Sequence, residues 1–358
     1  MNQSIIGVPA LLALLGVMFT PTAGEPGDGT LPETPLFSNA LEVVFFDVGQ
    51  GDCAVLITPG PNPRTIVIDG GFIGTARRTV VPFLRGRGIS QIDLMILTHP
   101  DRDHINGLRE LLRRFEVREV WDPGFIRGTT AYRDFEQLAR DDAGDRFYRP
   151  FEDQFVDTID EDTDDEVERR VVLGEPEIFG NVQIIPLHSN QHLEGPTEAY
   201  RINNSSIVVK VVFGENTILF TGDANGRQPN ADPTEVEAEG PFFTERALLE
   251  LDDSNPGLLQ STVLKVPHHG SLTSSSQQFV ERVRPEWAII SSAVTNHRLP
   301  RPSTLARYSA VRANIIRTDA GPEEEREDDH LVLIVGQREG DLIWRQADSS
   351  ALLEGLAQ

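Results

Sequence analysis

The stretch Leu94-Met95-Ile96-Leu97-Thr98-His99-Pro100-Asp101-Arg102-Asp103-His104 determines the fold class that we expect for this chain. Its first four residues are apolar and predict a short buried strand, and a helix is expected over Gly107–Phe115. Between them, two imidazoles and two carboxylates fall within six residues, from His99 to His104, at a strand-to-helix turn. Packing does not explain this density of metal-type ligands, so the turn predicts a metal site.

Three further clusters of candidate donors follow apolar runs. Asp223 comes after Leu219–Gly222, the pair His268-His269 comes after Val263–Pro267, and Asp69 comes after the run that ends at Ile68. Side chains at strand ends that share one edge of a sheet converge, so these donors are expected to meet the His99–His104 turn. Mixed histidine and carboxylate ligation suits zinc or manganese, and a larger share of carboxylate favours manganese.

Strand-like and helical patterns alternate from Leu41 onward. Two runs around the turn Gly214-Glu215-Asn216 predict a β-hairpin. Strands come in two batches with interleaved helices, and no repeat of solenoid length is present, so we expect one α/β domain with two sheets. The expected strands are Leu41–Phe46, Cys53–Thr58, Thr65–Ile68, Leu94–Leu97, Val117–Trp121, Val182–Ile185, Ser206–Phe213, Thr217–Phe220, Thr262–Val266, Trp287–Ile290, Ile315-Ile316, Leu331–Val335 and Leu342–Trp344, and the expected helices are Ala76–Arg87, Gly107–Phe115, Phe243–Leu251, Gln277–Val283 and Ser303–Val311.

The charge balance limits the partners of the chain. Its 358 residues carry 56 Asp and Glu against 32 Lys and Arg, a formal net charge of −24, and Lys210 and Lys265 are the only lysines. Such acidity opposes attraction to DNA, RNA or anionic lipid. A polyanionic substrate would need a local positive field, most simply from bound metal. The single cysteine, Cys53, excludes an intramolecular disulfide and a cysteine-rich zinc site, and is expected to be a buried free thiol.

The N-terminal region predicts an exported protein. Ile5–Phe19 is almost wholly apolar and is followed by the small residues Thr22-Ala23-Gly24, which suits a signal peptide over residues 1–24, although no Lys or Arg precedes the apolar run. An uncleaved membrane anchor is the alternative. Residues 25–40 are expected to be a linker, residues 41–345 the domain and residues 346–358 a tail. No other stretch reaches the length of a transmembrane helix, so no membrane bundle is expected.

Two segments are expected to be insertions in the domain, an acidic one at about 151–170 and a polar one at about 225–240. The acidic segment could be a calcium loop, but it lacks the central glycine and the carboxylate spacing of an EF-hand, so a solvated insertion is favoured. His188, His192 and His330 have no motif around them and are expected in loops or on the surface.

Taken together, the motifs resemble the metallo-β-lactamase superfamily, and more narrowly the β-lactamase-like domain of the DNA-uptake channel protein ComEC and its stand-alone relatives. The resemblance implies a four-layer αββα sandwich with metal ions at the rim between the two sheets. The motifs that carry it are Phe46–Asp52, Ile68–Gly71, Leu97–His104, Asn203–Ser206, Phe220–Ala224 and Leu264–Ser271.

The resemblance also assigns metal ligands, position by position. His99 and Asp101 would bind the first metal, with Asp101 where most of the superfamily has a second histidine. Asp103 and His104 would bind the second metal, and Asp223 would bridge the two. His268 or His269 would complete the second site, with His268 preferred. The middle histidine ligand of the superfamily is missing, and Asn203-Asn204 stands near its place, so the first site is expected to be poorer in ligands and weakly or conditionally filled.

Other motif residues are expected to contact the ligands or the substrate. Asp69 is expected to hydrogen-bond the ligand loop rather than bind metal. The loop with Asp47, Gln50 and Asp52 either makes such contacts or is a turn that requires its glycines. His297 follows Asn296 without the proline that is usual in the ComEC type, so it is either a substitute ligand-shell residue or a surface histidine. The candidates for these contacts are Asp47, Gln50, Asp52, Asp69, Asn203, Asn204, Lys265 and His297.

The resemblance implies a hydrolase with two divalent metal ions, zinc or manganese, that uses a metal-bridged hydroxide, with Asp103 and Asp223 as the central catalytic residues. Phosphodiester hydrolysis, by a phosphodiesterase or nuclease, is favoured, and the acidity of the chain favours small phosphodiesters or short oligonucleotides over stable binding of long DNA. The alternatives are a lactonase-type or other ester or amide hydrolase, and a secreted metal-binding protein without catalysis. β-Lactam hydrolysis is the least expected, because of Asp101 and the missing histidine.

Overall fold

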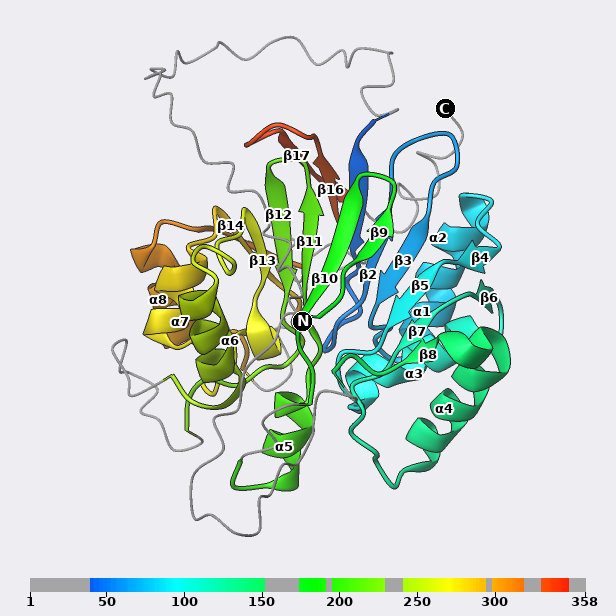
Figure 1. Ribbon diagram of the computed structural model, residues 1–358, viewed down its shortest axis with the longest axis horizontal. Helices are drawn as coiled ribbons and strands as arrows, with labels where there is room; N and C mark the ends of the chain where they lie inside the picture. Colours follow the sequence, from blue (N-terminus) through cyan, green and yellow to red (C-terminus); the bar gives the residue numbers. More distant parts are fainter. Residues whose placement is uncertain are drawn as a thin grey trace, which may run out of the picture. The chain divides into compact units, whose positions relative to one another are not determined.

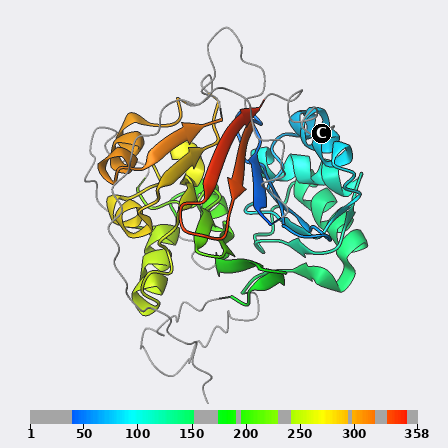
Figure 2. The ribbon, with the colours of Figure 1, turned by 90° about the horizontal axis from the view of Figure 1, so that it is seen from above.

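Two facing β-sheets with helices outside them form the body of the protein (Figures 1 and 2). This computed structural model describes residues 39–151, 174–190, 195–228, 241–293, 298–318 and 330–347, all within the unit Leu36–Gln358. Helices α1–α4 lie outside the first sheet and helices α6–α8 outside the second (Figure 1). The arrangement is the four-layer αββα sandwich that the motifs predicted.

The first sheet has the strand order β17-β16-β1-β2-β3-β5-β7-β8. Strands β3, β5, β7 and β8 are mutually parallel, so their carboxyl ends share one edge. A two-stranded sheet, β4-β6, lies apart from it. The elements of this half are β1 Leu41–Phe45, β2 Ala54–Ile57, β3 Thr65–Ile68, α1 Ile73–Arg78, α2 Val80–Gly86, β4 Gln91–Ile92, β5 Leu94–Ile96, α3 Arg102–Leu112, β6 Glu116–Val117, β7 Val120–Trp121, α4 Thr130–Ala143, β8 Phe147–Tyr148, β16 His330–Val335 and β17 Leu342–Ala347.

The second sheet has the order β15-β14-β13-β12-β11-β10-β9. Strands β12, β13, β14 and β15 are parallel, whereas β11 and β12 form the predicted hairpin, with Phe213 opposite Asn216. The elements of this half are β9 Glu177–Phe179, β10 Val182–His188, α5 Glu198–Asn204, β11 Val208–Phe213, β12 Asn216–Phe220, α6 Phe243–Ser254, β13 Val263–Lys265, α7 Gln277–Val283, β14 Trp287–Ile290, α8 Pro302–Ala310 and β15 Asn314–Arg317.

Three apolar layers hold the four layers of structure together. In β1, the side chain of Val44 packs toward α2 and α3, whereas those of Val43 and Phe45 face the second sheet. The ring of Phe45 stacks there on that of Phe220. A third layer lies between the second sheet and α6–α8. Both faces of the central strands are therefore buried, which explains why these strands are continuous apolar runs.

Two of the expected helices differ clearly from the prediction. The expected helix Ala76–Arg87 is divided at Thr79 into α1 and α2, which puts Pro82 in the first turn of α2, where its missing N–H is not needed. Helix α3 begins at Arg102, five residues earlier than expected. The earlier start puts Asp103 in the first turn, where the helix dipole favours a carboxylate, and makes His104 a helical residue.

Some residues were assigned to the wrong environment. His188 and His330 lie in β10 and β16 and are fully buried, so the expectation of loop or surface histidines was wrong for both. Cys53 is a buried free thiol, as predicted. Helix α4 was missed, although Tyr132 and Phe135 on one face are spaced for an amphipathic helix.

Several predicted segments fall outside the described residues. These include the signal peptide, most of the linker and of the tail, nearly all of the acidic segment, residues 229–240 of the polar segment, His192 and His297. Residues 225–228 of the polar segment are described, and Asn225 and Arg227 are fully buried there. Within the described ranges, no helix is long and apolar enough to span a membrane.

Candidate metal centre

The candidate donors lie beyond the carboxyl ends of parallel strands in both sheets. His99 to His104 follow β5, Asp223 follows β12, and His268-His269 follow β13. The two sheets meet at this edge, because the backbone N–H of Ile207 donates to the carbonyl of Thr98 at 2.9 Å. Residues separated by more than a hundred positions are thereby brought within a few ångströms of one another.

Asp223 lies between two groups of histidines. Its Oδ2 is 3.7 Å from Nε2 of His99 and 3.8 Å from Nε2 of His268. Its Oδ1 is 3.6 Å from Nε2 of His104 and 3.5 Å from Nε2 of His269. Each carboxylate oxygen therefore faces a different pair of imidazoles, which is the geometry of a bridging ligand.

One further aspartate joins each pair. Oδ2 of Asp101 is 3.8 Å from Nε2 of His99, and Oδ2 of Asp103 is 3.8 Å from Nε2 of His269. These separations are long for hydrogen bonds, but they are close to the roughly 3.4 Å that separates tetrahedral ligands of a zinc ion. We call His99, Asp101, His268 and Oδ2 of Asp223 the first set, and Asp103, His104, His269 and Oδ1 of Asp223 the second set.

Hydrogen bonds fix the protonation of two histidines. The hydroxyl of Thr98 donates to Oδ2 of Asp69 at 2.7 Å, so its oxygen accepts from Nδ1–H of His99 at 3.1 Å. Nδ1 of His104 lies 2.8 Å from the same Asp69 oxygen and donates to it. In the neutral ring the proton therefore sits on Nδ1, and Nε2 keeps its lone pair for a metal ion.

His269 is held in the same way, since its Nδ1–H donates to the carbonyl oxygen of Ser291 at 2.8 Å. Within the part of the chain that the structure describes, one atom of the first set and three atoms of the second set are buried and have no hydrogen-bond partner. Buried polar atoms without partners are uncommon in proteins, and these four are all donors of the type that zinc or manganese accepts. The residues therefore fit the metal pair that the motifs imply. These atoms are Nε2 of His99, His104 and His269, and Oδ1 of Asp223.

Burial and charge favour the metal-binding form of His99 and Asp223, whereas at His104 and His269 the carboxylates outweigh the effect of burial and raise the pKa of the ring. Burial lowers the pKa of His99 to about 4, and the neighbouring His104 lowers it further, so the ring is neutral at pH 7. Burial raises the pKa of Asp223, but His269 and His268 outweigh it and hold this pKa well below its usual value. A neutral imidazole and an ionised carboxylate are the forms that bind metal.

An unusual turn presents the two adjacent histidines to different sets. His268 and His269 have φ values of 48° and 53°, in the left-handed region that is uncommon for non-glycine residues. His269 lies beside Asp103 and Asp223 in the second set, whereas His268 lies on the other side of Asp223. The geometry therefore favours His269 for the second site, in place of the preferred His268, because among the described residues His269 groups with Asp103 and His104, whereas His268 faces the first set only through Asp223.

The predicted amide residues lie around His268. The side-chain nitrogen of Asn203 is 3.4 Å from Nε2 of His268, and Asn204 accepts a hydrogen bond from Asn225 at 3.0 Å. Asn225 and Thr273, which sequence reasoning missed, lie 3.3 and 3.1 Å from Nδ1 of His268. Asn203 and Asn204 end helix α5, which was not expected, so their motif gave no indication of this orientation.

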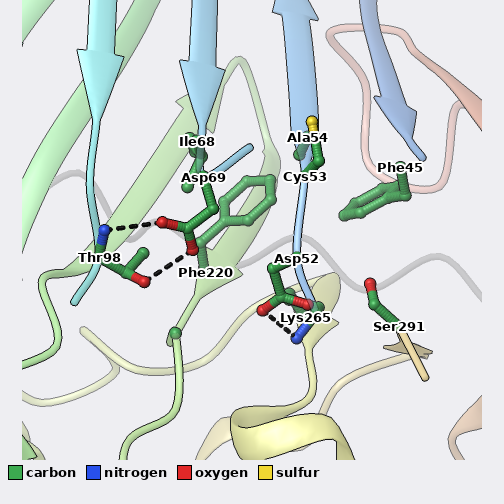
Figure 3. Close-up of a pocket in the computed structure, with 11 residues that line it drawn as sticks. Phe45, Asp52, Cys53, Ala54, Ile68, Asp69, Thr98, Phe220, Lys265 and Ser291 are labelled. Atoms are coloured by element: carbon green, nitrogen blue, oxygen red, sulfur yellow. Dashed lines mark hydrogen bonds and ion pairs between the residues drawn. The ribbon is translucent and has the colours of Figure 1, made fainter. Parts of the chain in front are cut away.

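Asp69 and Asp52 line a pocket together with Thr98 and Lys265, and Figure 3 shows the carboxylate of Asp69 directed at Thr98 and that of Asp52 directed at Lys265. Asp69 accepts from the backbone N–H and the hydroxyl of Thr98 as well as from His104, the role that was expected of it. Asp52 is paired with Nζ of Lys265 at 2.7 Å, and its other oxygen is 3.5 Å from Nδ1 of His269. Asp52 and Lys265 are both buried, which suits support of the ligands better than contact with a substrate.

The remaining loop candidates have structural contacts. Oδ1 of Asp47 accepts from the N–H of Gly49, and the N–H of Asp47 donates to Nδ1 of His330. The side chain of Gln50 is nearly buried. The Cβ that an alanine would add at Gly51 would lie 2.4 Å from the carbonyl oxygen of Asp103, so this loop must carry a glycine where it approaches the ligand helix.

Replacing Lys265 with methionine is expected to lower the free energy of unfolding by about 3 kcal/mol, because the buried Asp52 carboxylate loses its counter-ion. Adding Asp52→Asn should restore at least half of that loss. Urea denaturation of the two variants measures both effects. A single variant within about 1 kcal/mol of the wild type would show that this ion pair does not stabilise the fold.

The comparisons with known proteins agree with the motifs. Residues 43–183 match the family model described as the Metallo-beta-lactamase superfamily. ComE operon protein 3 of Bacillus subtilis (strain 168) is 26% identical over 303 residues, 80% of this chain and 33% of that protein. Competence protein ComA of Neisseria gonorrhoeae is 26% identical over 288 residues, 78% of this chain and 31% of that protein.

A solved structure, the Rm3 metallo-beta-lactamase, aligns with a TM-score of 0.35 at 16% identity, over 77% of this chain and 89% of that one. The chain spans about a third of the length of the curated relatives that it matches.

Proposed function

Since the chain carries a metallo-β-lactamase domain of the ComEC type, we propose that it is a metal-dependent hydrolase that cleaves phosphodiester bonds. The observation that carries the proposal is Asp223, with one oxygen toward each of two sets of donors. Each set offers two imidazoles and two carboxylates, a mixture that suits zinc or manganese.

The protein groups would hold two metal ions and limit what reaches them. Bound there, such ions supply an activated water and a Lewis acid for the scissile oxygen. Asp69 fixes the ring of His104, and Ser291 fixes that of His269, so the donors are oriented before metal or substrate arrives. Asp101, Asp103 and His268 are the partly exposed donors, while His99 and His104 are fully buried, so substrate would reach the centre from the side of these three residues.

The charge around the donors supports an anionic substrate only when metal is bound. Five carboxylates, those of Asp52, Asp69, Asp101, Asp103 and Asp223, surround the two sets, and two cationic side chains contact them, Lys265 and Arg127. Two divalent ions reverse this balance locally, which a phosphodiester requires. The net charge of −24 favours small phosphodiesters or short oligonucleotides over long DNA. Export remains part of the proposal, on the apolar run Ile5–Phe19.

The proposal is tested with bis(p-nitrophenyl) phosphate and a short oligonucleotide, with manganese or zinc supplied. We expect hydrolysis by the wild type that Asp103→Ala reduces by at least about 100-fold, since Asp103 is a ligand of the second set. Asp141→Ala, which removes an exposed carboxylate of α4, should leave the rate unchanged. Hydrolysis of p-nitrophenyl acetate or a lactone with no phosphodiester cleavage would replace the proposal with the ester-hydrolase alternative.

A further inference from the structure

The loop that joins β7 to α4 lies at the same edge as the candidate metal centre. Strand β7 pairs in parallel with β5, with Trp121 opposite Ile96, so the residues after the two strands emerge side by side (Figure 1). The start of the loop is anchored, because buried Asp122 accepts from the hydroxyl of Tyr132 at 3.0 Å and from Nε of Arg149 at 3.1 Å. The loop therefore has a defined position beside the ligand turn.

Arg127 of this loop reaches a metal-ligand candidate directly. Its Nη1 donates to Oδ1 of Asp101 at 2.5 Å and to the carbonyl oxygen of Pro100 at 2.9 Å. The other oxygen of Asp101 is the one that faces His99. Arg127 thus contacts the first set through the carboxylate of Asp101.

The pair is partly open to solvent, as are Asp103 and His268, whereas the other histidines of the centre are buried. The side chain of Arg127 is 24% exposed and that of Asp101 is 29% exposed, whereas His99 is fully buried. Lys265, the other cation in contact with these carboxylates, is 4% exposed and lies behind the histidines. Among the described cations that contact the five carboxylates, Arg127 is therefore the one that an incoming substrate can meet.

Only one nitrogen of the guanidinium is used in these contacts. Nε and Nη2 of Arg127 have no hydrogen-bond partner in the described parts of the chain. A guanidinium offers donors in a fixed planar fork that matches two oxygens of a phosphate. We propose that Arg127 binds the anionic group of the substrate. Nη1 donates to Asp101, and Nε and Nη2 donate to oxygens of a phosphate-type anion beside the first set. This rests on the proposed function and names the residue that selects an anionic substrate.

The test is inorganic phosphate binding to the metal-loaded full chain, measured by calorimetry together with metal content. Arg127→Gln is expected to weaken phosphate binding by at least about tenfold, the size of one charge-assisted contact, while two metals per chain are retained. Arg127→Lys, which keeps the charge but loses the fork, should fall between Gln and the wild type. Arg133→Gln is the matched control, because among the described residues the side chain of Arg133 hydrogen-bonds only to Gly128 and Thr130, and its loss changes the net charge equally.

Two results would overturn the inference. Phosphate affinity that is unchanged in Arg127→Gln, or equally reduced in Arg133→Gln, would exclude a specific contact. Loss of a metal ion in Arg127→Gln would show that the residue only positions Asp101. Phosphate binding that depends on Arg127 in a protein that cleaves no phosphodiester would instead reject the proposed function and keep the anion site.

Discussion

Replacing Asp223 with alanine is expected to remove both metal ions and to lower any metal-dependent hydrolysis by at least about 100-fold. Mutating a residue that only hydrogen-bonds a metal ligand already lowers activity by up to about 100-fold, so losing a ligand should cost at least as much. The reason is that Asp223 is shared: Oδ2 faces His99 and His268, and Oδ1 faces His104 and His269. A carboxylate that served one set would leave the other intact. Metal content after dialysis against limiting manganese or zinc measures the effect directly.

His99→Ala provides the comparison for this experiment. Its Nε2 belongs only to the first set, so about one metal ion per chain should remain, held by Asp103, His104 and His269. Asp223→Asn, which keeps the shape of the side chain, separates lost ligation from lost packing. If Asp223→Ala and His99→Ala each retain one ion, Asp223 does not bridge, and the two sets are independent sites.

The motifs predicted the candidate donors because polar residues just after parallel strands can converge at one edge of a sheet, and strand ends are visible as apolar runs that stop at polar residues. Thus His99, Asp223 and His269 were found from sequence, and in the structure both histidines lie beside Asp223. Periodicity cannot show which way a turn faces. The left-handed backbone conformations of His268 and His269 direct the two adjacent rings to different oxygens of Asp223. The amino-acid sequence gives no indication of these backbone conformations.

Arg127 was missed for a related reason. It lies in the loop 122–129, which contains Gly124 and Gly128, between a two-residue strand and a helix that was not expected, so no motif surrounded it. The available indication was indirect: Val120-Trp121 continues the parallel order β3, β5, β7, and the loop after it must begin beside the turn that follows β5. Contacts between loops depend on sheet order, which local pattern does not reveal.

Replacing Gly107 with alanine is expected to lower the free energy of unfolding by about 3–5 kcal/mol, from overpacking together with disturbed backbone hydrogen bonds. Helix α3 touches the loop after β3 here, and the added Cβ would lie 1.7 Å from the carbonyl oxygen of Gly70. The contact leaves no flexible side chain to move, because both partners are backbone. Two hydrogen bonds hold it, from Gly70 N–H to the carbonyl of His104 at 2.9 Å and from Gly107 N–H to the carbonyl of Gly71 at 2.8 Å.

The same substitution should weaken the second metal set, since any shift of α3 moves His104 away from Asp69. Urea denaturation with and without manganese or zinc measures both effects, because a metal that binds only the folded state adds stability of RT ln(1 + L/Kd), where L is the free metal concentration. Gly74→Ala is the matched control: this glycine is also helical, but its added Cβ would meet only the tip of Arg78 at 3.4 Å. Alanine there should leave stability unchanged or raise it by up to about 1 kcal/mol. A Gly107→Ala protein as stable as Gly74→Ala would mean that α3 can move off β3 without cost, and that His104 is not held by this contact.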